Sequence, residues 1–316
     1  MVEPTILQIM QIYYPVLASF GLPANLVTIV ILSRGNCGLS KCITIYMVAM
    51  ATADLLVIIF NVIVYQIFSK LFPHSFLSYT AVCNFIVYMQ CNNVGISVLF
   101  TVSFTFDRFV AICCHTFKAN YCTVRTASAV ITTVSVLIGL LNIPMCFAFE
   151  HKLIINNIPW GLSPKLDFFS STAVRRILVA SRARQGLRSH SSENQNDPEM
   201  ENRRKSIILL FTVSGSFILL WLTAIASNLT SGPAVHYRPE YTAPAYIAIQ
   251  TGNMLLFLSS CTNTCIYAAT QTKFREELKQ GEQKRFLLKQ RTSRPRFKAN
   301  SHDYDSAVEE NMWRQR

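Results

Sequence analysis

Charged residues are scarce in this chain of 316 amino acids. Asp, Glu, Lys and Arg make up 15% of the sequence, whereas about a quarter of a typical soluble chain is charged. Apolar residues account for 51%. This scarcity argues against a water-soluble globular protein, and it makes the positions of the few charges informative.

Long stretches of the chain contain almost no charge. The charge-free stretches are residues 4–33, 71–106, 126–149, 206–237 and 241–272, and a sixth, 42–69, holds only Asp54. Each is long enough for a membrane helix, which needs about 20 mostly apolar residues. We therefore expect an all-α, polytopic membrane helix bundle with six clear spans. Their approximate bounds are 9–32, 43–68, 80–108, 126–148, 205–229 and 244–270.

Several other features are missing from the sequence. The N-terminus, MVEPTILQ, lacks the basic region of a cleavable signal peptide, so we expect the first span to insert the chain. The ten cysteines show neither metal-ligand spacing nor a small-domain disulfide framework. We find no pairing of nucleophile and base, so we expect neither an enzyme nor a bound metal.

The net charge of +12 does not indicate a nucleic-acid partner, because the basic residues cluster in loops beside apolar spans, as in cytoplasmic loops of membrane proteins. With the N-terminus outside and seven crossings, all but four of the 29 Lys and Arg residues lie in cytoplasmic segments. The exceptions are Lys70, Lys152, Lys165 and Arg238. Six crossings would place most of the basic residues on the wrong side, so a crossing is missing between Phe149 and Arg175.

The stretch that should supply this crossing is NNIPWGLSPKLDFFSSTAVRRILVASR, residues 156–182. It contains Lys165, Asp167, Arg175 and Arg176, and each charge at the centre of a span costs about 2.5 to 3.5 kcal/mol. Between Lys165 and Arg175 lie only the nine residues 166–174, too few to span a bilayer. We therefore expect the fifth helix to be missing or truncated, with NNIPW ending an outer loop.

Several motifs fall in order on the predicted spans. They are Asn25 in GLPANL, Asp54 in MATADLL, Cys83 near the outer end of the third span, Asp107-Arg108-Phe109 at its inner end, Phe217 and Trp221 in FILLWL, and NTCIY with Asn263 and Tyr267. Together these resemble rhodopsin-like (class A) G-protein-coupled receptors. The stretches FTFDRFVAICC and RRILVASRARQGLR resemble the orphan group around probable G-protein coupled receptor 139.

The resemblance implies a plasma-membrane, multi-pass receptor with its N-terminus outside and its C-terminus in the cytoplasm. It implies an aromatic amino acid-like small molecule or a peptide as ligand, and a heterotrimeric G protein and the lipid bilayer as partners. The implied ligand-binding residues are Gln90, Cys91, Val94, Trp221, Asn228 and Asn253. Ala224 stands where one relative carries an Arg that could pair with a ligand carboxylate, so a free amino acid is not expected.

The resemblance also implies an activation switch and a polar core. The switch residues are Asp107, Arg108, Phe109, Phe217, Trp221, Asn263 and Tyr267. The polar core comprises Asn25, Asp54, Ser97 and Asn263, where a sodium ion could bind; the alternative is a protonated, hydrogen-bonded structural Asp54. Thr223 and Thr264 replace prolines of the family pattern, which weakens the expected helix kinks.

The outer loop has lost the cysteine that would pair with Cys83, so we expect Cys83 to be unpaired. TKFREELKQ suits an amphipathic helix at 272–281 on the inner leaflet. The expected organisation is a receptor bundle at 1–283 and a disordered cytoplasmic tail at 284–316.

Three functions remain open. The first is a signalling receptor. The second is a non-signalling truncated receptor isoform or an incomplete gene model, which shares the fold but lacks the fifth helix. The third is a transporter or channel, which would call for inverted repeats or several intramembrane charges, and we find neither pattern in the sequence.

Overall fold

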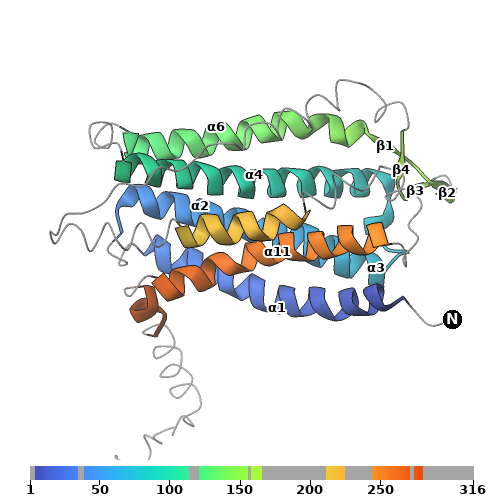
Figure 1. Cartoon of the computed structure of the whole chain (residues 1–316). Coiled ribbons are helices and arrows are strands. Elements are labelled where there is room, and N and C mark those ends of the chain that lie inside the picture. The colour runs from blue at the N-terminus through green and yellow to red at the C-terminus, as the bar shows by residue number, and fades with distance from the viewer. Residues whose placement is uncertain are drawn as a thin grey trace, which may run out of the picture. The chain divides into compact units, whose positions relative to one another are not determined.

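Long helices that pack side by side make up most of the structure, a computed structural model (Figure 1). Met1–Arg275 forms one unit and Glu276–Arg316 forms a second. The structure describes residues 4–34, 39–113, 121–155, 158–165, 211–224, 244–270 and 274–279.

The first two apolar stretches form α1 (Thr5–Ser33) and α2 (Lys41–Val57). The Ser40 side chain caps α2 by accepting a hydrogen bond from a backbone amide in the first turn, an amide that has no partner within the helix. α2 continues into the π-helix η1 (Ile58–Phe68) and the single turn α3 (Ser69–Leu71), which together form one long rod.

The third and fourth stretches form α4 (Thr80–Cys113), preceded by the short turn η2 (Phe76–Ser78), and α6 (Val124–Asn142). The side chain of Thr123 caps the start of α6. α6 passes into the 3-10 turn η3 (Ile143–Phe147), which has a proline in its first turn. Proline cannot donate the helical backbone hydrogen bond, so the α-helix ends there.

The last apolar stretch forms α11 (Pro244–Thr270). The helix Phe211–Ala224 lies inside the span expected at 205–229, the fifth of the six, whose two ends fall outside the described residues. A short helix at 274–279 lies inside the expected amphipathic segment. The expected tail and most of the truncated fifth-helix region, including Arg175, fall outside the described residues.

In the part of the chain that the structure describes, four helices are long and apolar enough to cross a membrane. They are Thr5–Ser33, Lys41–Leu71, Thr80–Ile112 and Val124–Phe147. α11 has the length of a span, but buried polar residues such as Ser260 and Asn263 lower its hydropathy. The expected all-α membrane helix bundle is therefore confirmed, while the total number of crossings stays a prediction.

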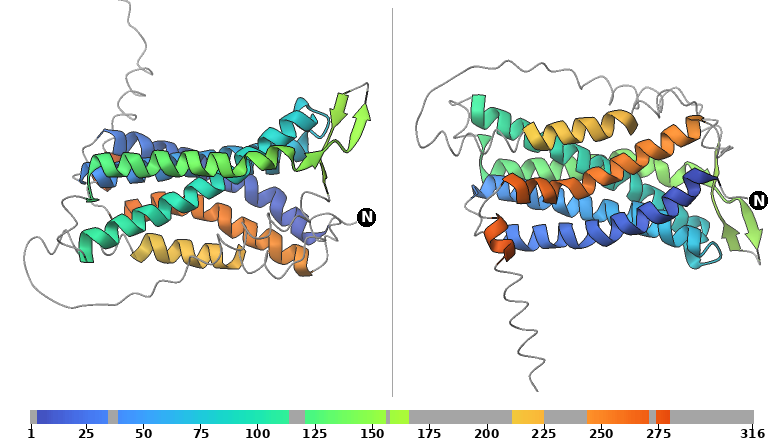
Figure 2. Two further views of the ribbon diagram at one scale, coloured as in Figure 1. Left: turned by 90° about the horizontal axis from the view of Figure 1, so that it is seen from above. Right: turned by 60° about the horizontal axis from the view of Figure 1, so that its bottom comes forward.

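Two sets of helix contacts organise the bundle. α4 packs against α2 and α6, and α1 packs against α2, η1 and α11 (Figures 1 and 2). α1 and α11 approach closely at Gly21, where an added Cβ would lie 2.5 Å from Cys261 Sγ. The helix Phe211–Ala224 meets α11 at Gly252, where a Cβ would lie 2.8 Å from the Cα of Ala224. Both glycines are needed for close packing rather than for backbone freedom.

A small β-structure follows α6 and was not anticipated from the sequence. β1 (Phe149–Glu150) pairs with β4 (Ser163–Pro164), and β2 (Leu153–Ile155) pairs with β3 (Ile158–Trp160), both antiparallel. We call residues 149–165 the outer hairpin, because the topology expected from the sequence places the end of α6 on the outer side. Gly161 has a φ of 69°, in the left-handed region that glycine enters without steric cost.

Candidate functional site

Asp54 is the centre of a hydrogen-bonded bridge between three helices. The carboxylate is 1% exposed. Ser97 Oγ of α4 donates to Asp54 Oδ1 at 2.6 Å, and Asn263 Nδ2 of α11 donates to Oδ2 at 2.7 Å. A carboxylate inside a membrane protein is costly without such partners. The structure thus brings three of the four expected polar-core residues into direct contact.

Asn25, the fourth polar-core residue, is buried but bonds to backbone rather than to Asp54. Its Nδ2 donates to the carbonyls of Gly21 at 3.0 Å and Ser260 at 2.9 Å. Its Oδ1 is buried and accepts no hydrogen bond from a protein atom. The side chain therefore ties α1 to α11 and leaves one buried oxygen available as an acceptor.

The oxygen atoms around Asp54 suit a small hard cation. Such a cation prefers carboxylate, carbonyl and hydroxyl oxygens as ligands. Asp54 supplies a carboxylate, Ser97 a hydroxyl and Asn25 an amide oxygen, all buried in the same polar core. A bound sodium ion is therefore compatible with the side chains present.

Asp107 and Arg108 form a buried ion pair at the inner end of α4, where they are 1% and 5% exposed. Arg108 Nε donates to Asp107 Oδ2 at 3.0 Å, and Nη2 contacts the same oxygen. The guanidinium also lies over the ring of Phe104, 5.9 Å from its centroid. Phe109, the third residue of the motif, is 48% exposed and takes no part in the pair.

Sequence reasoning missed two cysteines beside this ion pair. Cys42 Sγ, at the start of α2, lies 3.5 Å from the second carboxylate oxygen, Asp107 Oδ1. Cys122 Sγ, just before α6, lies 3.6 Å from the backbone carbonyl of the same residue. Three helical segments therefore converge on Asp107. Single cysteines in apolar sequence are usually packing residues, so no pattern marked these two.

Trp221 and Phe217 stack within the helix Phe211–Ala224, with ring centroids 5.1 Å apart. Trp221 Nε1 donates to Ser259 Oγ of α11 at 3.3 Å. One hydrogen bond that the sequence did not predict ties this helix to α4, between Thr105 Oγ1 and Ser214 Oγ at 2.9 Å. Trp221 thus contacts α11, and both expected aromatic switch residues share a helix with a bond to α4.

Tyr267 and Thr264 occupy the inner half of α11. Tyr267 is fully buried, its ring packs edge-on against Phe274 at 6.4 Å, and its hydroxyl has no protein hydrogen-bond partner. Thr264, which replaces a proline, shares a 2.8 Å hydrogen bond with Thr28 of α1. The substitution therefore adds a hydroxyl contact between α1 and α11 at the position where the family pattern has a kink.

One comparison with known proteins bears on these residues. Residues 24–158 match the family model described as 7 transmembrane receptor (rhodopsin family). This segment is similar in sequence to the rhodopsin family of receptors. The match runs from the middle of α1 to the outer hairpin and includes Asp54, Ser97, Asp107 and Arg108. It covers less than half of the chain and ends before the helix Phe211–Ala224 and α11.

Three of the expected ligand-binding residues, Gln90, Cys91 and Val94, lie in the matched segment and are half-buried on α4. Val94 packs against the apolar core between α1 and η1. Within the described part of the chain, no hydrogen bond or ring contact joins these three side chains to Trp221 or Asn253. Asn228 lies outside the described residues. The structure therefore does not assemble the expected ligand set through direct contacts.

At the outer end of the segment, the Cys83 thiol lies 3.0 Å from the carbonyl of Leu77. The outer hairpin is held to the start of α4 by other contacts. The Gly161 amide donates to the Ser78 carbonyl at 2.8 Å, and Thr80 Oγ1 donates to the Gly161 carbonyl at 2.9 Å. The rings of Tyr79 and Trp160 meet edge-to-face at 4.8 Å. Non-covalent contacts thus hold the hairpin at the position where a disulfide was expected to be missing.

Proposed function

We propose that this chain is of the rhodopsin-like receptor type, and that the receptor with an intact fifth helix lies in the plasma membrane with its N-terminus outside and transmits an extracellular ligand signal to a heterotrimeric G protein. The observation that carries the proposal is the buried Asp107–Arg108 pair, which lies on the same helix as Ser97 and inside the segment that matches the rhodopsin family. We assign the chain, on its sequence texture, to the orphan group named above.

In this proposal the helix Phe211–Ala224 carries the signal. A ligand that contacts the outer half of the bundle shifts Trp221 and its stacked partner Phe217. Ser214 of the same helix is hydrogen-bonded to Thr105 of α4. A movement of this helix therefore displaces Thr105, which lies one turn before Arg108. Release of Arg108 from Asp107 then exposes a cationic side chain to the G protein. Such two-state helix shifts are a common form of switching.

A sodium ion at Asp54 would stabilise the resting state. It would bind the carboxylate together with Ser97 and Asn25, and it would strengthen the link between α1, α2 and α4. We propose this role from the oxygen ligands in the polar core. Sodium-dependent thermal stability of the wild-type chain, lost in Asp54→Asn, is the expected result.

A second candidate is the non-signalling truncated receptor. It is favoured by one observation: the outer hairpin occupies residues 149–165, so only residues 166–174 separate it from Arg175. No apolar run long enough for a span remains between these points. For the chain as written, we expect this candidate to describe its behaviour.

Guanine-nucleotide exchange decides between the two candidates. Membranes containing surface-expressed chain are mixed with purified heterotrimeric G proteins of several classes. A competent receptor gives basal exchange that rises in Asp107→Asn, which frees Arg108, and disappears in Arg108→Ala. Absence of exchange from all three chains, at matched surface levels, supports the truncated candidate. The transcript sequence around Trp160 to Thr172 then shows whether an in-frame apolar segment is missing.

A further inference from the structure

We propose that a tyrosine cluster between α1, η1 and α11 binds an anionic group on an apolar body, and that Lys70 supplies the positive charge. The cluster comprises Tyr13, Tyr14, Tyr65 and Tyr246. The inference deepens the proposed function and rests on it, because it names the class of ligand that the outer half of the receptor would take.

Lys70 lies in α3, the last turn of the long rod that α2, η1 and α3 form. This turn is at the outer end of the rod in the proposed orientation. Its Nζ is 5.8 Å from the centroid of the Tyr14 ring and donates to Gln66 Oε1 at 2.6 Å. The ion pairs among the described residues join other side chains, so no described carboxylate balances this charge. An ammonium has three N–H donors, so two remain for a ligand.

Tyr14 makes the inner wall of the cluster. It is 1% exposed, and its buried hydroxyl has no hydrogen-bond partner among the described residues. Its ring packs edge-on against Tyr13 at 5.5 Å and in a tilted arrangement against Phe257 at 6.2 Å. Leaving a buried hydroxyl without a partner costs about 1 to 3 kcal/mol, so this donor calls for an acceptor that the protein itself does not supply.

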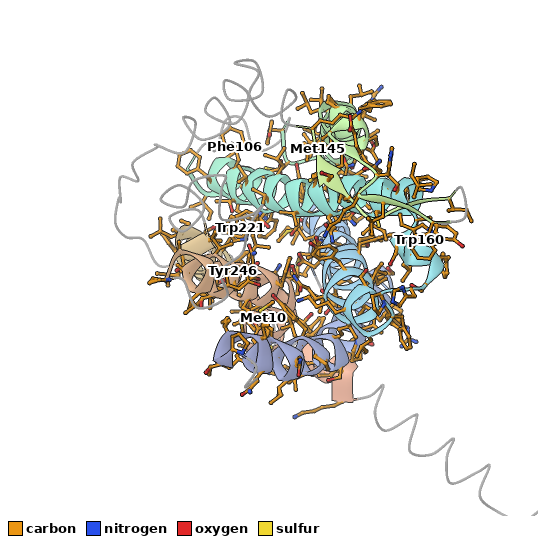
Figure 3. The ribbon with its side chains drawn as sticks, turned by 90° about the vertical axis from the view of Figure 1, so that its right-hand side faces the viewer. Met10, Phe106, Met145, Trp160, Trp221 and Tyr246 are labelled. Carbon is orange, nitrogen blue, oxygen red and sulfur yellow. The ribbon has the colours of Figure 1, made fainter. Side chains whose placement is uncertain are left out.

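The other tyrosines surround Tyr14 from three elements. Tyr13 donates its hydroxyl to the carbonyl of Met254 at 2.7 Å, which fixes α1 against α11. Tyr65 lies near Tyr14, and Tyr246 packs against the apolar core to which Tyr14 belongs. Tyr65, on η1, is 46% exposed, so the cluster is open on that side. Met10 and Tyr246 border the same apolar core (Figure 3).

These features select an anion over a cation. A cluster of tyrosine rings by itself would suit a cationic ligand, but Lys70 already lies over the Tyr14 ring and would repel one. An ammonium and phenol hydroxyls are both donors to a carboxylate or phosphate. The apolar side chains that border the cluster, such as Ile67, then suit an apolar body. Ala224 stands where one relative carries an Arg, so that position supplies no cation. Lys70 of α3 supplies one instead.

The simplest competing explanation is that Lys70 extends its ammonium toward water while its methylenes cover apolar surface. That explanation accounts for the exposed end of the side chain. It does not account for the buried hydroxyl of Tyr14, which has no hydrogen-bond partner among the described residues and belongs to the ring that Lys70 Nζ approaches.

The test uses the full chain in phosphatidylcholine nanodiscs with 3-phenylpropionate as the probe, and 3-phenylpropan-1-ol as the uncharged isostere. Thermal unfolding is measured for the wild type, Lys70→Met, Lys70→Arg and Tyr14→Phe. Lys165→Met serves as the control, because Lys165 is also on the outer side but pairs with Glu150. Each variant is compared with its own probe-free melting temperature, so a general loss of stability is separated from a loss of binding.

We expect the anion, and not the alcohol, to raise the melting temperature of the wild type and of Lys165→Met. The apparent affinity should fall at least about tenfold in Lys70→Met, because a charge-assisted hydrogen bond is worth about 1.5 to 3 kcal/mol. Lys70→Arg should keep most of it and Tyr14→Phe should lose part. No shift of the wild type at millimolar anion, or equal shifts in wild type and Lys70→Met, would overturn the inference.

Adding phosphatidylglycerol to the nanodiscs distinguishes the source of the anion. If a lipid headgroup is the ligand, this lipid raises the melting temperature of the wild type but not of Lys70→Met, and it competes with 3-phenylpropionate. If a free ligand is bound, phosphatidylglycerol leaves the probe affinity unchanged. Neither measurement requires a G protein. Probe binding without nucleotide exchange therefore refutes the signalling proposal but not this site. Nucleotide exchange without probe binding refutes this site but not the signalling proposal.

Discussion

At the scale of single residues, the bundle depends on polar side chains whose partners lie on other helices. Asp54 is held by Ser97 and Asn263, and Asp107 by Arg108 and Cys42. A buried charged group that loses one partner is left with an unpaired charge. Substitutions of the partners are therefore expected to be as informative as substitutions of the acids themselves.

Ser97→Ala removes the hydroxyl that donates to Asp54 Oδ1 at 2.6 Å. We expect the free energy of unfolding to fall by about 1 to 3 kcal/mol, because a buried carboxylate oxygen loses its donor. Thr52→Ala is the matched control, since Thr52 is exposed and its hydroxyl bonds only to the carbonyl of Val48 in its own helix. Thermal unfolding in nanodiscs measures both; equal losses would show that the bond to Asp54 is not special.

At the scale of elements, short polar contacts connect helices that are otherwise apolar. The Thr105–Ser214 bond joins α4 to the helix Phe211–Ala224, and the Thr28–Thr264 bond joins α1 to α11. Hydrogen bonds between membrane helices contribute about 0.6 kcal/mol on average. Each bond is therefore too weak to hold the bundle together, but strong enough to bias two helix arrangements that are close in energy.

A double-mutant cycle on Thr105→Val and Ser214→Ala measures this bias. We expect a coupling free energy of about 0.6 kcal/mol, and at most about 1.7, for side chains that face each other across two membrane helices. Thr105→Val combined with Ser216→Ala is the control cycle, because Ser216 bonds to the carbonyl of Val213 within its own helix. Equal coupling free energies in the two cycles would contradict a direct bond between Thr105 and Ser214.

Gly161→Ala tests how the outer hairpin is held. At a φ of 69° an alanine is strained, and its Cβ would lie 3.2 Å from the Cβ of Lys152. We expect a local destabilisation of about 1 kcal/mol, seen as faster amide hydrogen exchange in residues 149–165. Gly215→Ala, where the added Cβ meets nothing within 4 Å, should leave that exchange unchanged. Unaltered exchange in Gly161→Ala would show that the hairpin does not need its left-handed turn.

Several of these elements could not be predicted from the sequence. Long apolar stretches indicate spans by length alone, so six spans were predicted, and four of them are helices long and apolar enough to cross a membrane in the described part of the chain. Threonines such as Thr28 and Thr105 gave no signal, because a helical threonine usually bonds a carbonyl in its own helix. Strands of two or three residues, as in the outer hairpin, are too short for a period-two pattern. Asn25 was expected in the polar core with Asp54, but its hydrogen bond to the α11 backbone could not be predicted.

At the scale of the whole molecule, the proposal turns on one crossing. Two basic segments lie on the same side of a membrane only if an even number of spans separates them, but only the span expected at 126–148 separates the basic loop after the third span from the basic segment 175–205. The outer hairpin takes up the residues that would otherwise begin a fifth helix. We therefore expect this chain to contain the Asp107–Arg108 pair but not to activate a G protein.

The chain as written should be retained in the cell and should give no guanine-nucleotide exchange. Insertion of about 20 apolar residues after Phe169, enough for one span, should bring Gln185 and the C-terminus to the cytoplasmic side. Protease accessibility of tags at these two points measures the topology, and an insert of 20 Gly and Ser residues is the control. Robust ligand-dependent exchange from the unmodified chain at the cell surface would refute the prediction.

The pairing of α1 with α11 has a consequence for how the protein is made. Asn25 and its partner carbonyl on Ser260 are 235 residues apart in the chain. At about 5 to 20 residues per second, the first helix waits roughly ten to fifty seconds before its partner leaves the ribosome. During that interval the buried amide of Asn25 lacks its second acceptor, and lipids or membrane chaperones must shield this face. The first helix synthesised is thus among the last to reach its final contacts.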